Sequence, residues 1–127
     1  MSATGWDKAL AALGALAGLA GVALSAAAAH VTGPGSLETA ARFLLFHAPA
    51  LLGTAALAGM GLIHPGAGRA AGFALALGLA LFSGDLALRA LGGGPLSPLA
   101  APTGGFVLML GWGLIAVAAV LPAKDRA

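Results

Sequence analysis

Residues 9–29 read ALAALGALAGLAGVALSAAAA, and this stretch decides the fold. It contains no charged residue, and its 21 residues match the roughly 20 that an α-helix needs to cross the hydrocarbon core of a membrane. Alanine, leucine and glycine fill it, and a helix satisfies all of its own backbone hydrogen bonds, as a lipid environment requires. The stretch therefore predicts a transmembrane helix over residues 9–30.

Three further stretches have the same character. They are rich in alanine, leucine and glycine and poor in β-branched residues, which favours helices over the strands of a barrel. Short segments with glycine and proline separate them, at residues 32–36, 64–68 and 92–95. We therefore predict one all-α domain over residues 1–127, a membrane-spanning four-helix bundle with the later spans at 37–63, 69–91 and 103–121.

The composition supports a membrane environment. Hydrophobic residues make up 60% of the 127 residues and charged residues 8%, whereas a typical soluble domain has about 25% charged residues. The net charge of +2 comes from scattered basic residues that form no stripe, which argues against a nucleic-acid partner. The chain has no cysteine, which excludes disulfides, thiolate metal sites and cysteine nucleophiles.

The first apolar stretch has an alternative interpretation as a secretory signal. Lys8, the apolar run and the alanines at 26–28 resemble the three regions of such a peptide. The run of 21 residues is longer than the roughly 7–15 of a signal core, so we favour a retained membrane helix.

The positions of the basic residues predict the orientation. Four spans place both termini and the connection between the second and third spans on one side of the membrane. The positive-inside rule then predicts that both termini are cytoplasmic. That side holds Lys8, Arg69, Lys124 and Arg126, and the other side holds Arg42 and Arg89.

The same topology gathers most polar side chains of the spans into one half of the membrane, the half away from the termini. We expect almost no polarity inside the membrane in the other half. The gathered residues form a candidate polar cluster: His30, Glu38, Arg42, His47, Ser83, Asp85, Arg89 and Thr103.

Asp85 and His47 each have two interpretations. Glu38 and Arg42 are spaced to form a favourable pair on one helix, and so are Asp85 and Arg89. The first interpretation of Asp85 is such a self-neutralising pair, and the second is a proton or cation site. His47 likewise either bonds a neighbouring helix or belongs to that site.

Known chemical motifs are absent from the sequence. It contains no G-x-S-x-G, no H-E-x-x-H and no P-loop, so we expect no enzyme activity and no cofactor. Two histidines and a carboxylate could bind a divalent ion, but their spacing matches no ligand motif, and we predict no metal site.

Small residues recur along the spans. Gly14 and Gly18 form a G-x-x-x-G, and Gly72, Gly78 and Gly84 recur along the third span. Such residues let helices approach closely in lipid. They favour tight packing within the bundle or between subunits.

Several short motifs occur in order along the chain: 26–30 (ending in Ala-His), 38–40 (Glu-Thr-Ala), 46–48 (Phe-His-Ala), 51–52 (Leu-Leu), 81–84 (Leu-Phe-Ser-Gly), 102–105 (Pro-Thr-Gly-Gly) and 111–112 (Gly-Trp). Together they resemble the domain-of-unknown-function 423 family of small bacterial inner-membrane proteins, which is related to the eukaryotic transmembrane protein 256 group. The chain departs from the usual pattern with Phe-Leu at 43–44, where the family often has Tyr-Gln, and with Asp85 in place of serine. The resemblance implies the topology and an inner-membrane location, and no reaction or substrate.

Two functions are consistent with these features. We expect a non-enzymatic structural or accessory protein that contacts membrane lipid and associates with a second copy or with another membrane protein. The alternative is a small transporter or channel that moves protons, cations or a small solute through the polar cluster.

Overall fold

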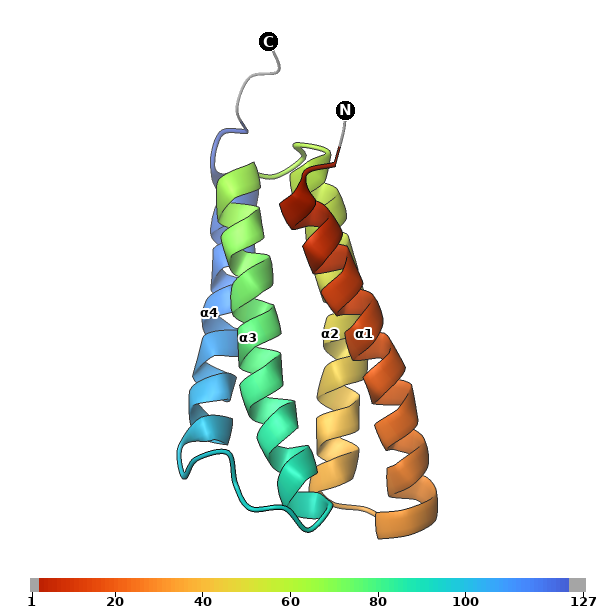
Figure 1. The fold of residues 1–127 in the computed structure, drawn as a ribbon. Coiled ribbons are helices and arrows are strands. Elements are labelled where there is room, and N and C mark those ends of the chain that lie inside the picture. Colours follow the sequence, from red (N-terminus) through yellow and green to blue (C-terminus); the bar gives the residue numbers. More distant parts are fainter. Residues whose placement is uncertain (1–2, 124–127) are drawn as a thin grey trace.

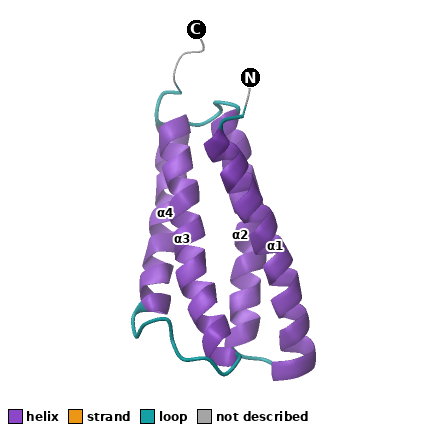
Figure 2. Ribbon diagram, in the orientation of Figure 1, coloured by secondary structure: helices purple, strands orange, loops and turns teal. Residues whose placement is uncertain are grey.

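The computed structural model describes residues 3–123, and within them the chain forms four long helices and no strand (Figures 1 and 2). The helices are α1 (Gly5–Ala27), α2 (Ser36–Gly59), α3 (Pro65–Ala90) and α4 (Ala100–Val120). A π-helical turn, η1 (Ala28–Thr32), extends α1. All four helices are long and apolar enough to cross a membrane, and the prediction of an all-α, four-helix fold is confirmed.

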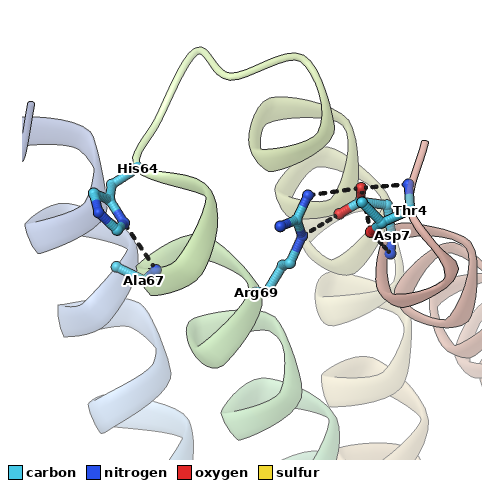
Figure 3. Close-up of polar contacts among 5 residues, drawn as sticks. All are labelled: Thr4, Asp7, His64, Ala67 and Arg69. Carbon is cyan, nitrogen blue, oxygen red and sulfur yellow. Dashed lines mark hydrogen bonds and ion pairs between the residues drawn. The ribbon is translucent and has the colours of Figure 1, made fainter. Parts of the chain in front are cut away.

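Polar caps lengthen two helices beyond the spans expected from hydrophobicity. α1 begins at Gly5, where the side chain of Thr4 accepts from the backbone of Asp7 and the Asp7 carboxylate accepts from the backbone of Thr4. α3 begins at Pro65, after the ring of His64 accepts a backbone N–H of the first turn (Figure 3). Asp7 and Lys8 in the first turn of α1, and the Pro-Gly-Ala-Gly start of α3, lie outside the strongly apolar stretches.

The helices pack in chain order. α1 lies on α2, α2 on α3 and α3 on α4, while α1 meets α3 over a smaller area. α1 and α4 lie at opposite edges, and no extensive contact joins them within residues 3–123. The bundle is therefore an open array with α2 and α3 in its middle (Figure 1).

The array has two distinct ends. At one end α1 begins, α4 ends and the connection from α2 to α3 crosses (Figure 1). We call this the terminal end. The linker from η1 to α2 and the longer connection from α3 to α4 lie at the other end, which we call the loop end.

Small residues form the contact between α1 and α2. The buried positions of α1 are spaced alternately by three and four residues, as in the seam of a coiled coil. A Cβ atom on Gly14 would lie 3.0 Å from the carbonyl oxygen of Ala48, and one on Gly21 would lie 2.9 Å from the side chain of Leu45. The two backbones are therefore too close for larger side chains at these positions.

The contact between α3 and α4 is closer still. A Cβ atom on Gly78 would lie 2.9 Å from the carbonyl oxygen of Gly104. One on Gly104 would lie 2.6 Å from the backbone nitrogen of Phe82. The expected packing role of glycines in the third span is met by Gly78 at this crossing and by Gly72, which faces Leu10 of α1.

Leucines fill the space between the two helix pairs. The buried core consists mainly of leucine side chains from all four helices, with alanines between them. Its largest members are Leu10, Leu51, Leu75, Leu79 and Leu108.

The crossing of α3 and α4 gives the first testable prediction. We expect Gly104→Ala to lower the free energy of unfolding in detergent micelles by about 1–3 kcal/mol, because a backbone atom must move to admit the methyl group. Thermal unfolding followed by circular dichroism measures the change. The matched control is Gly105→Ala, whose Cβ would meet nothing within 4 Å. Equal stability of the two variants would contradict the close approach.

Candidate functional site

The structure does not bring the members of the candidate polar cluster into one site. Six of the eight lie in separate contacts with protein partners, and His47 lies at the middle of α2. Among residues 3–123, no buried polar side-chain atom lacks a hydrogen-bond partner. His30 and Thr103 are exposed, and the other members lie in the contacts described below: Glu38, Arg42, His47, Ser83, Asp85 and Arg89.

His47 is the polar residue nearest the middle of the array, and it is only 5% exposed. Its Nδ1 lies 2.7 Å from the carbonyl oxygen of Phe43, and its Nε2 lies 3.2 Å from the indole Nε1 of Trp112 on α4. Because an indole N–H can only donate, Nε2 must accept, and the Nδ1 proton is donated to Phe43. Both ring nitrogens are therefore committed to the protein.

His47 belongs to a row of aromatic side chains that joins three helices. The ring of Phe43 is stacked on His47 with centroids 5.8 Å apart, and it lies 4.3 Å from the ring of Phe82 on α3. Trp112 reaches His47 from the other side, with centroids also 5.8 Å apart. The row connects α4, α2 and α3 across the middle of the array.

Asp85 is completely buried near the end of α3. One carboxylate oxygen accepts from Nε of Arg89 at 2.9 Å, and the other accepts from the backbone N–H of Leu96 at 2.9 Å. The carboxylate thus neutralises a charge on its own helix and fixes the connection to α4. This geometry agrees with the self-neutralising interpretation of Asp85.

Ser83 and Glu38 have local roles as well. The hydroxyl of Ser83 donates to the carbonyl oxygen of Ala40 at 3.0 Å, which adds a polar link between α3 and α2. Glu38 accepts from Arg42 at 2.6 Å, and this pair on one helix was expected from its spacing.

A further buried ion pair lies at the terminal end of the array. Asp7 is 4% exposed, and its carboxylate accepts from Nε and Nη2 of Arg69 at 2.8 and 3.0 Å (Figure 3). Thr4 donates to the same carboxylate through its hydroxyl and its backbone N–H. Asp7 lies in the first turn of α1, before the predicted first span, and Arg69 is the first residue of the predicted third span. The expectation of little polarity inside this half of the membrane stays a prediction.

Sequence reasoning missed several members of these contacts, and two of them have a recognisable signal. Asp7 is signalled by the spacing Thr4-x-x-Asp7, which is typical of a capping box at a helix start. Trp112 is signalled by its indole N–H, which needs an acceptor when it lies in an apolar span.

The arrangement gives little support for metal chemistry. Among residues 3–123, no three His, Cys, Asp or Glu side chains are grouped so that they could hold an ion. His47 and Asp85 each have protein partners of their own, and neither nitrogen of His47 is left to serve as a ligand.

The four helices are long and apolar enough to cross a membrane, and their buried polar side-chain atoms are bonded within the protein. These features indicate a multi-pass helical membrane protein. Residues 24–105 match a protein family of unknown function, DUF423, and the chain belongs to this family. This confirms the resemblance in the sequence, while the relation to the transmembrane protein 256 group stays a prediction. The comparisons found no match among curated proteins and no match among solved structures.

The contact between His47 and Trp112 gives a second prediction. We expect Trp112→Phe to lower the free energy of unfolding by about 1–3 kcal/mol, because Nε2 of the buried His47 loses its donor. Chemical unfolding in micelles, followed by circular dichroism, measures the change. The control is Trp6→Phe, which removes the same group from a residue that is 65% exposed. A smaller loss for Trp112→Phe than for Trp6→Phe would contradict the assigned bond.

The two kinds of ion pair give a third prediction. Arg69→Gln leaves the charge of buried Asp7 without its partner, and we expect a loss of about 3–5 kcal/mol in the free energy of unfolding. Arg42→Gln is the matched control, since this arginine is 66% exposed, and we expect a change within about 1 kcal/mol. The double variant Asp7→Asn/Arg69→Gln should recover part of the loss. A double variant less stable than Arg69→Gln would show that an unpaired Asp7 charge is not the cause of the loss.

Proposed function

We propose that the protein is a non-enzymatic structural or accessory component of the bacterial inner membrane, with both termini in the cytoplasm. The observation that carries this proposal is that, among residues 3–123, every buried polar side-chain atom has a hydrogen-bond partner within the protein. His47, Ser83 and Asp85 each bond a different neighbour, and each of these bonds joins or fixes structural elements. Polar groups used in this way stabilise a scaffold.

The open array supports association with another membrane component. α1 and α4 each bury one narrow stripe and expose large apolar side chains outside it. Lipid covers such faces in a monomer, and a second copy or another membrane protein could cover part of them. The exposed residues with the largest fractions include Leu19 at 69%, Phe106 at 70% and Val120 at 82%.

Cross-linking in native membranes tests this proposal. We expect a photo-reactive residue at exposed Phe106 to trap a defined protein, either a second copy or one reproducible partner. The same probe at Gly84, where a Cβ would already lie 3.8 Å from Leu96 within the chain, is the control. Products of monomer size alone at Phe106, in membranes with native expression, would contradict the proposal.

The alternative proposal is a small transporter or channel for protons, cations or a small solute. The observation in its favour is His47, a titratable side chain near the middle of the array and beside α4. Reconstituted vesicles with ion-sensitive dyes test it. Flux that falls in His47→Ala and Asp85→Asn would favour transport over the accessory role, and an absence of flux in the unmodified protein would count against transport.

A further inference from the structure

A cavity of about 290 Å³ lies at the loop end, on the contact between α1 and α2. Its wall combines the last turns of α1 and η1, the linker and the first turns of α2. None of the polar contacts that join one helix to another occupies it. Its lining residues are Ser25, Ala28, Ala29, Gly33, Pro34 and Glu38.

The backbone shapes this cavity. η1 is a π-helical turn, a wider form that is rare in proteins and is frequently found at functional sites. Gly33 follows it with a φ of 74°, a conformation that other residues rarely adopt, and Pro34 restricts the next step of the chain. The chain thus turns sharply into α2 and leaves the hollow on its inner side.

Two of the six lining residues, Ser25 and Glu38, have polar side chains, and the other four are alanine, glycine or proline. The C-terminal end of a helix presents carbonyl groups without helical partners and carries partial negative charge. Glu38 adds a full carboxylate, and Ser25 adds a hydroxyl. Such a cavity favours a ligand group that donates hydrogen bonds and carries a positive charge, such as a primary ammonium.

Arg42 is not a lining residue, but it is bonded to Glu38 and adds the opposite charge. Its Nη2 donates to Glu38 at 2.6 Å, so its guanidinium lies next to the carboxylate that lines the cavity. The side chain is 66% exposed, and the guanidinium has further N–H groups that can bind a phosphate. Arg42 and Glu38 together therefore present a cation beside an anion.

We propose that this cavity binds the phosphoethanolamine headgroup of a membrane lipid, with the ammonium group at Glu38 and Ser25 and the phosphate at Arg42. The charges of the headgroup are complementary to those of the site. The membrane is the source of the ligand, because the loop end lies where helices of this length reach the headgroup region. This proposal rests on membrane residence and is independent of the accessory role.

Lipid binding to the purified full-length protein tests the proposal. Native mass spectrometry measures the retention of dioleoyl phosphatidylethanolamine and of dioleoyl phosphatidylglycerol, which has the same chains and no ammonium group. We expect stronger retention of phosphatidylethanolamine, and about tenfold or greater weakening of it in Glu38→Gln and in Arg42→Gln. Ser25→Ala should weaken it to a smaller extent. Lys8→Gln, which removes an exposed charge at the terminal end, should leave it unchanged.

The outcomes distinguish a headgroup site from nonspecific adhesion of lipid to the apolar helices. Circular dichroism of each variant establishes that the helices are intact. Ser25→Ala changes the cavity wall while the ion pair of Glu38 and Arg42 stays in place. Competition by soluble phosphoethanolamine would support recognition of the headgroup. Equal retention of the two lipids, or unchanged retention in Glu38→Gln and Arg42→Gln, would overturn the proposal.

Two further results are informative. One identifies the source of the ligand, and the other distinguishes failure of the headgroup site from failure of the accessory role. Binding of soluble phosphoethanolamine without binding of the lipid would overturn the membrane source. Loss of lipid selectivity would leave the cross-linking result at Phe106 unaffected, so the headgroup site and the accessory role fail separately.

Discussion

Lipid offers no hydrogen-bond partner, and the rest of this structure depends on that constraint. A polar group left open in the hydrocarbon region costs several kcal/mol, so it must be satisfied inside the protein. The polar residues of the spans meet this demand in two ways. Asp85 and Glu38 pair with arginines one turn away on their own helices, whereas Asp7 and His47 bind partners on other helices. Contacts of the second kind fix how the helices are placed relative to each other.

Small residues then determine how closely the helices approach. Without a hydrophobic force between helices in lipid, van der Waals contact between backbones supplies much of the attraction. Glycines occupy the closest points, Gly14 between α1 and α2 and Gly78 with Gly104 between α3 and α4. Two directional contacts join further pairs of helices. They are the ion pair of Asp7 with Arg69 and the hydrogen bond from Trp112 to His47. The outcome is an open array whose two edge helices expose most of their apolar surface.

The fold could be predicted from hydrophobicity and helix length, since each helix carries its own signal over 20 or more residues. The pairs Glu38–Arg42 and Asp85–Arg89 could be predicted for a similar reason, because a spacing of four places two side chains on one helix face. The pairs Asp7–Arg69 and His47–Trp112 join residues 62 and 65 positions apart. They depend on the rotation of each helix about its axis, which one sequence does not determine. The partners of the residues in the predicted polar cluster could therefore be predicted within one helix but not between helices.

The central claim is that the buried polar residues within the helices are bound to protein neighbours and do not line a shared aqueous site. The ¹⁵N resonances of the His47 ring test this most directly, measured by nuclear magnetic resonance on histidine-labelled protein in micelles. The structure predicts a protonated Nδ1, an unprotonated Nε2 that accepts the Trp112 indole proton, and slow exchange of both protons with water. A proton on Nε2, or rapid exchange of these protons with water, would contradict the claim.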